Sequence, residues 1–190
     1  MIKNNFKENA VYIVLSHTGT RFSRVIKHMT KIPYSHVSIA IDEDLDELYS
    51  FGRKHPKNPF YCGFVKEDII NGTFAYFPNT MCSIYKLEVD HNTYNNIKHN
   101  INVFKSKRIL TYNFPGVVGL SVNKSISIPR SYFCSEFVAT ILEDSNVTLF
   151  RKPPSSVTPK DFLECELYEL YYSGLLGAYY HNRKIRICAV

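Results

Sequence analysis

The stretch IPRSYFCSEFVATIL, residues 128–142, changes from a polar loop marked by a proline into an apolar helix. Ser131 could cap this helix, which would leave Cys134 in its first turn. Backbone N–H groups and the helix dipole stabilise negative charge at that position, and the thiolate is the reactive form of cysteine. Cys134 is therefore a candidate nucleophile, although a small buried side chain on an apolar helix explains the same pattern. The apolar face consists of Phe133, Phe137, Val138, Ile141 and Leu142.

Several stretches predict β-strands around this helix. Residues 10–18, AVYIVLSHT, form the short β-branched and apolar run of a buried strand. Residues 35–42, SHVSIAID, alternate, which predicts a half-buried strand that pairs as a hairpin with ELYSFG, residues 47–52. TFAYF, residues 73–77, and MCSIYKLEV, residues 81–89, predict two more strands. In the alternating strand Val37, Ile39 and Ile41 share one face, and His36, Ser38 and Ala40 share the other.

Apolar residues at helical spacing predict further helices. One covers GTRFSRVIKHMTK, residues 19–31, and another covers DHNTYNNIKHNINVFKSK, residues 90–107, with Asp90 or Asn92 as its cap. TPKD, residues 158–161, has the pattern of a capping box that starts a third. Inward-facing residues are Phe22, Val25, Ile26 and Met29 in the first helix, and Ile97, Ile101 and Phe104 in the second.

Residues 52–68, GRKHPKNPFYCGFVKED, contain two prolines and two glycines and show little periodicity, so they predict a long surface loop. The loop is rich in basic residues, and these could border a cleft and favour acidic substrates. Ordinary solvation of a loop explains the same charges. The residues concerned are Arg53, Lys54, His55 and Lys57.

Length and composition indicate one globular domain, residues 1–190. The net charge of +6 is spread along the chain, whereas nucleic-acid binding normally needs a concentrated basic stripe, so we expect no nucleic-acid partner. No stretch has the roughly 18 uninterrupted apolar residues of a membrane helix, and no export signal is recognisable. The five cysteines form an odd set without close pairs. These features predict free thiols in a cytoplasmic protein.

Several familiar sites are missing from the sequence. It has no Cys-x-x-Cys or His-Glu-x-x-His ligand pair, no phosphate-binding or dinucleotide glycine motif, and no Gly-x-Ser-x-Gly elbow. We therefore expect neither a metal nor a cofactor. A thiol and an imidazole on regular elements remain, and His36 is the favoured imidazole because Ser38 and Ala40 beside it are small. A hydrogen-bonded structural histidine is the alternative.

Two motifs together resemble a known family. FCSEFVATIL, residues 133–142, resembles the start of the nucleophile helix in NlpC-type papain-like cysteine peptidases, and SHVSIAID resembles their histidine strand. Here the histidine precedes the cysteine, as in the circularly permuted branch, which includes permuted amidase-like enzymes and lecithin-retinol acyltransferase relatives. TYNFPG, residues 111–116, is similar to the tyrosine segment of the superfamily. The resemblance spans residues 11–172 and implies an α+β fold, an antiparallel sheet or half-barrel packed on helices.

The resemblance implies a role for each matching residue. Cys134 is the expected nucleophile, His36 its general base and then acid, and Tyr112 the expected oxyanion donor. Permuted relatives often carry a glutamate on the strand after the histidine strand, and here Ser50 stands at that position. Glu47 is close in sequence, but its odd offset puts it on the other face of the strand. Ser50 can accept a hydrogen bond from the imidazole but cannot stabilise an imidazolium as a carboxylate does.

The expected function is a cysteine hydrolase that cleaves an amide through a thioester, in a peptide or a cell-wall-derived fragment. Acyl transfer from a lipid or thioester is a second interpretation and would require a wide apolar cleft. A third is a binding module that kept the pocket but lost turnover, because Ser50 replaces the carboxylate. The sequence does not indicate an oligomeric state.

Overall fold

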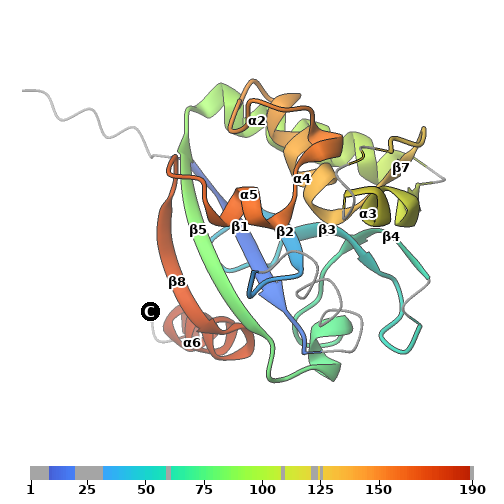
Figure 1. The fold of residues 1–190 in the computed structure, drawn as a ribbon. Helices are drawn as coiled ribbons and strands as arrows, with labels where there is room; N and C mark the ends of the chain where they lie inside the picture. The colour runs from blue at the N-terminus through green and yellow to red at the C-terminus, as the bar shows by residue number, and fades with distance from the viewer. Residues whose placement is uncertain are drawn as a thin grey trace, which may run out of the picture.

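The computed structural model describes residues 9–19, 32–58, 61–107, 110–120, 124 and 126–188, without the side chain of Cys188. The described part is an α+β structure built on a six-stranded antiparallel sheet of strand order β4-β3-β2-β1-β5-β8 (Figure 1). The α+β class predicted from the sequence is confirmed. The strands are β1 (Asn9–His17), β2 (His36–Ala40), β3 (Leu48–Arg53), β4 (Cys62–Lys66), β5 (Met81–Val89) and β8 (Glu169–Leu175).

Helices follow or connect these strands. The α-helices are α2 (His91–Ser106), α3 (Phe114–Leu120), α4 (Cys134–Glu143), α5 (Pro159–Leu163) and α6 (Leu176–Cys188). Two 3-10 helices, η1 (Thr73–Tyr76) and η2 (Pro154–Ser156), lie in the connections. A short parallel pair, β6 (Thr111–Tyr112) with β7 (Ser131–Tyr132), precedes α4. Among the described residues, no helix is both long enough and apolar enough to cross a membrane.

Both faces of the sheet are covered. On one face, Val37 and Ile39 of β2 join an apolar core with residues of α2, α4 and α5. On the other face, Ala40 joins a second core with residues of η1 and α6. Figure 1 shows α2 and α4 on one side of the sheet and α6 on the other. The prediction of a half-buried β2 is wrong because this second layer buries its other face.

Capping residues in the sequence predict the starts of two helices correctly. The Asp90 carboxylate accepts hydrogen bonds from the backbone N–H groups of Asn92, at 2.8 Å, and Thr93, at 2.9 Å, so Asp90 caps α2 as predicted. The Thr158 N–H donates to Asp161 at 2.7 Å at the start of α5, again as predicted. The inward residues predicted for α2, which are Ile97, Ile101 and Phe104, are buried.

Other expectations are wrong. Residues 52–68 are not a surface loop, because they contain the end of β3 and the whole of β4. TFAYF forms η1 rather than a strand. Ser131 does not cap α4, because its pairing with Thr111 keeps the backbone extended and the helix begins after Phe133. The helix predicted over residues 19–31 lies, from residue 20 onward, outside the described residues.

Candidate active site

Cys134 is the first residue of α4, and aromatic packing fixes its position against the sheet. Phe137, one turn further along the helix, packs on Phe51 of β3 with ring centroids 5.3 Å apart and on Phe104 of α2 at 5.1 Å. Such ring pairs each add about 0.5–1.5 kcal/mol beyond burial. The Ser135 hydroxyl donates to the Val157 carbonyl oxygen at 2.7 Å and ties down the same turn. Cys134 itself is only 5% exposed.

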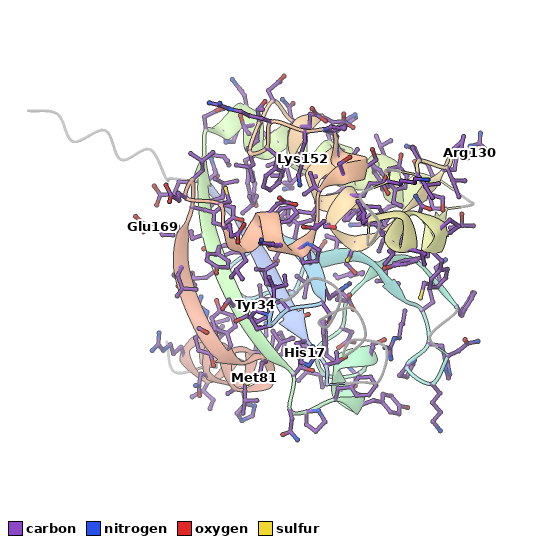
Figure 2. The ribbon with its side chains drawn as sticks, viewed as in Figure 1. His17, Tyr34, Met81, Arg130, Lys152 and Glu169 are labelled. Carbon is purple, nitrogen blue, oxygen red and sulfur yellow. The ribbon has the colours of Figure 1, made fainter. Side chains whose placement is uncertain are left out.

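His36 is the first residue of β2 and lies opposite Ser16 of β1. This is the end of the sheet at which His17 pairs with Met81, and both are labelled there in Figure 2. The imidazole hydrogen-bonds with the Cys134 thiol, although the two residues are far apart in the sequence. The structure therefore brings together the thiol and the imidazole that the sequence analysis selected.

Glu67 is the third member of this arrangement, and the sequence analysis missed it. Its Oε1 atom lies 2.9 Å from His36 Nε2 and accepts a hydrogen bond from the Ser50 hydroxyl at 2.6 Å. The side chain is only 6% exposed. Its backbone N–H donates to the Leu48 carbonyl oxygen at 2.8 Å, which extends the pairing of β4 with β3. A buried carboxylate thus contacts the imidazole at Nε2.

The two groups that the sequence analysis considered for this role make other contacts. The Ser50 hydroxyl donates a hydrogen bond to Glu67, and it is Glu67 that contacts Nε2 of the imidazole. Glu47 binds Lys66 and Tyr49 instead of His36. Ser50 therefore belongs to the site as a group that holds the carboxylate, and the carboxylate comes from the segment predicted to be a loop.

Strand register explains how Glu67 reaches His36. Ser50 pairs with Val65 and Gly52 pairs with Gly63, so Glu67 lies on the same sheet face as Ser50, diagonally across the β3–β4 hairpin. His36 occupies the corresponding face of β2. The run YCGFV, residues 61–65, was the available signal, because its aromatic and β-branched residues are typical of a strand.

Tyr112 approaches Cys134 from the parallel pair in front of α4. It pairs with Tyr132, two residues before the cysteine, and its hydroxyl hydrogen-bonds with the Cys134 sulfur. Burial and the neighbouring Cys134 raise the pKa of Tyr112 well above its ordinary value. The hydroxyl therefore keeps its proton at neutral pH and can donate a hydrogen bond.

Electrostatics favour a charged thiolate–imidazolium pair. Burial lowers the pKa of His36, but hydrogen bonds to Cys134 and Glu67 outweigh burial and raise that pKa to about 10. Burial opposes ionisation of Cys134, yet hydrogen bonding to His36 and to the backbone N–H groups of Val37 and Ser135 lowers the pKa of the thiol. By contrast, burial raises the pKa of Cys62 to about 11. The lowered thiol pKa thus distinguishes Cys134 from Cys62 as the candidate nucleophile.

A cavity of about 70 Å³ opens beside these groups. Its wall includes His36, Glu67, Tyr112, Gly52 and Arg53. Cys134 does not line the wall but is hydrogen-bonded to two residues that do. The space suits a small polar group next to the imidazole and the tyrosine hydroxyl.

In the part of the chain that the structure describes, no group of three or more His, Cys, Asp or Glu side chains could hold a metal ion. The four cysteines with described side chains are all free thiols, as expected, namely Cys62, Cys82, Cys134 and Cys165. The chain matches no protein-family model, no curated protein and no solved structure. Function must therefore be inferred from the site itself.

Proposed function

We propose that this chain is a cysteine hydrolase that cleaves an amide bond through a thioester intermediate. The observation that carries the proposal is the position of His36 between the Cys134 thiol and the Glu67 carboxylate. A nucleophile, a base and a group that orients the base are the parts that nucleophilic catalysis requires. Burial of the carboxylate and the shifted pKa of the pair add support, because such shifts cluster at functional sites.

In the proposed reaction, the Cys134 thiolate attacks the substrate carbonyl carbon and a tetrahedral oxyanion forms. Because Glu67 contacts Nε2 of His36, Nδ1 is left to face the sulfur. The imidazolium donates its proton to the departing amine as the C–N bond breaks, which leaves a thioester on Cys134. Neutral His36 then takes a proton from water as the water oxygen attacks the thioester carbon. The C–S bond breaks, which releases the carboxylic acid and restores the Cys134 thiolate and the imidazolium.

Donors for the oxyanion are available beside the sulfur. The Tyr112 hydroxyl and the backbone N–H of Ser135 both hydrogen-bond with the Cys134 sulfur. Groups so close to the nucleophile are well placed to stabilise a negative oxygen on the carbon that it attacks. One such donor typically accounts for about 10²–10³ in rate.

The proposal includes a permuted papain-like fold. An antiparallel sheet bears the histidine on β2, and the helix that begins with the cysteine, α4, packs on that sheet and follows later in the chain. This order agrees with the resemblance of SHVSIAID and FCSEFVATIL to the permuted branch.

The site favours this function over the two alternatives. The binding-module interpretation rested on the lack of a carboxylate at Ser50, and Glu67 supplies one. Acyl transfer from a lipid calls for a wide apolar cleft, whereas the cavity beside His36 is small and partly lined by charged and hydroxyl groups. A peptide or a cell-wall-derived fragment is therefore the preferred substrate.

A chemically activated ester tests the proposal without knowledge of the natural substrate. p-Nitrophenyl acetate should acetylate Cys134 faster than Cys62 or Cys165, with a burst of nitrophenolate followed by slow turnover. Peptide mass spectrometry identifies the acetylated thiol. His36→Ala should slow acetylation of Cys134 by about 10²-fold or more. Acetylation of Cys134 at the rate of Cys62, unchanged in His36→Ala, would rule the proposal out.

A further inference from the structure

Arg53 is the one residue of the basic group in segment 52–68 that reaches the cavity beside His36. It is the last residue of β3, it is half-buried, and it lines the same wall as His36, Glu67 and Tyr112. Lys54, His55 and Lys57 are more exposed, and none of them lines this cavity.

Arg53 contacts its neighbours through both side chain and backbone. Its guanidinium carbon lies over the Phe77 ring, 5.7 Å from the ring centroid, and its carbonyl oxygen accepts a hydrogen bond from the Thr73 hydroxyl at 3.3 Å. Burial lowers the pKa of Arg53, and its charge interacts with Cys62 and with Tyr112, the residue hydrogen-bonded to Cys134. Arginine nevertheless stays protonated in proteins. A positively charged residue therefore lines the cavity together with His36 and Tyr112.

Arg53 offers a positive charge to a substrate anion that enters this cavity. The carboxylate on the same wall, Glu67, is engaged by His36 and Ser50. Cys134 loses its negative charge when its sulfur becomes part of a thioester. A carboxylate on the substrate would then add a negative charge opposite Arg53, whose planar fork of N–H donors matches a carboxylate in two-point contact.

We infer that Arg53 selects substrates that carry a carboxylate close to the scissile carbonyl group. This inference rests on the proposed function and specifies its substrate class. The small volume of the cavity favours a short acidic group, such as the carboxylate of an acidic residue or of a chain end.

Two alkylating reagents of nearly the same size test the inference. Iodoacetate carries a carboxylate and iodoacetamide a neutral amide, and in both the Cys134 sulfur forms an S–C bond while iodide leaves with its electron pair. In the wild-type protein, Arg53 should favour iodoacetate. Arg53→Gln should lower the iodoacetate-to-iodoacetamide rate ratio at Cys134 roughly tenfold or more, because a charge-assisted hydrogen bond is lost. Arg53→Lys should keep only part of the ratio, because lysine keeps the positive charge but lacks the planar fork of donors.

The matched control is Lys57→Gln, which removes an exposed positive charge from the same hairpin and should leave the ratio unchanged. Any effect of Arg53 on the thiol pKa changes both rates equally and cancels in the ratio. An unchanged ratio in Arg53→Gln overturns the inference, whereas slow labelling of wild-type Cys134 by iodoacetamide overturns the proposed function instead.

A measurement on the wild-type protein covers the case in which Arg53→Gln does not fold. Acetate and acetamide are added at equal concentration and ionic strength, and labelling of Cys134 by iodoacetamide is followed. Acetate should slow labelling more than acetamide does. Equal protection by the two compounds contradicts carboxylate recognition.

Discussion

At the scale of single residues, the carboxylate of Glu67 decides how His36 works. It contacts Nε2 at 2.9 Å and is itself held by the Ser50 hydroxyl at 2.6 Å. A carboxylate in this position fixes the tautomer and orientation of the ring and stabilises the imidazolium. In the proposed reaction, Glu67 is thus a positioning residue that acts through His36.

Replacing Glu67 by Gln keeps the shape of the side chain but removes its charge. We expect the rate of Cys134 labelling by iodoacetamide at neutral pH to fall about tenfold. A loss of about 1.4 kcal/mol in stabilisation of the charged pair raises the pKa of the thiol by one unit, and the reactive thiolate fraction falls with it. Competitive labelling followed by peptide mass spectrometry measures the rate. The pH profile of Cys134 labelling should also shift to higher pH.

Glu47→Gln is the matched control for Glu67→Gln. Glu47 is also a carboxylate near β3, but it binds Lys66 and Tyr49 and not His36. Its replacement should leave Cys134 labelling unchanged. Equal effects of the two substitutions would show that general surface charge, rather than the contact with His36, controls the reactivity of the Cys134 thiol.

The pKa values of the pair predict how reactivity depends on pH. The thiol pKa of Cys134 is lowered from its ordinary value of 9.0, so the labelling midpoint of the wild-type protein should lie below pH 9. In His36→Ala the imidazole no longer lowers the pKa of the Cys134 thiol, whereas burial still raises it. The labelling midpoint should therefore move above pH 9. Labelling rates measured from pH 5 to pH 11 check this shift. An identical midpoint in both proteins contradicts the thiolate–imidazolium pair.

The same pair has a consequence for stability. The pKa of His36 is raised from 6.5 to about 10 on folding. Its contribution to stability is therefore fully present below pH 6.5 and is lost as the pH rises towards 10. Urea unfolding of the wild-type protein and His36→Ala should show a difference in stability that narrows between these two pH values.

At the scale of elements, local patterns predict strands and helices well, and contacts between strands less well. The alternation in SHVSIAID and the capping signals at Asp90 and TPKD depend on neighbouring residues only, and β2, α2 and α5 form there. The face shared by His36, Ser38 and Ala40 follows from the two-residue period of a strand. The two-residue period does not reveal that α6 and η1 cover the face that carries Ala40.

The partner of His36 could not be read from any local pattern. Glu67 reaches the imidazole only because β4 pairs with β3 in the register that sets Ser50 against Val65. A one-residue change of register would turn Glu67 to the other face. Two prolines in the segment favoured a loop, although both lie before β4 begins at Cys62. The cysteine and histidine were found because their motifs are local.

Gly52 of β3 provides the space in which this arrangement fits. A β-carbon added there would lie 3.1 Å from Ser50 Oγ, 3.2 Å from Glu67 Oε1 and 3.3 Å from His36 Cε1. Contacts this short are tighter than most contacts that a β-carbon makes in proteins. Gly52→Ala should displace the carboxylate or the ring by a few tenths of an ångström and slow Cys134 labelling roughly threefold to tenfold.

Gly177→Ala is the control for Gly52→Ala. Apart from its chain neighbours and its own helix backbone, no heavy atom of the described residues would lie within 4 Å of a β-carbon at Gly177 in α6. Because alanine favours helix over glycine by about 0.5–1 kcal/mol, this variant should be as stable as the wild-type protein or more stable, with unchanged labelling. Normal labelling in Gly52→Ala would mean that the site tolerates the added methyl group.

At the scale of the whole molecule, a cluster of charges fixes α6 to the turn between β2 and β3. Arg183 Nη1 lies 2.7 Å from Glu43 Oε1, and its Nε atom lies 2.9 Å from Asp44 Oδ1. Lys184 Nζ lies 2.6 Å from Asp46 Oδ2. This turn follows the last residue of β2, whereas His36 is the first. The cluster and the candidate site therefore lie at opposite ends of one strand.

This separation predicts that stability and reactivity can be changed independently. Arg183→Gln removes two ion pairs of a side chain that is 20% exposed. The free energy of unfolding should fall by about 1–2 kcal/mol at low salt and by less at high salt, because exposed ion pairs are screened. Cys134 labelling in the folded protein should stay unchanged, because the contacts of His36 with Cys134 and Glu67 are untouched.

Urea unfolding at two salt concentrations, together with iodoacetamide labelling, checks this prediction. Arg186→Gln is the control, because Arg186 is an exposed arginine on the same helix and its loss removes the same charge. Arg183→Gln should be the less stable of the two, and both should label at the wild-type rate. Slower labelling in Arg183→Gln alone would mean that β2 transmits a change in the turn to His36, and that the sheet is less rigid than its two covered faces imply.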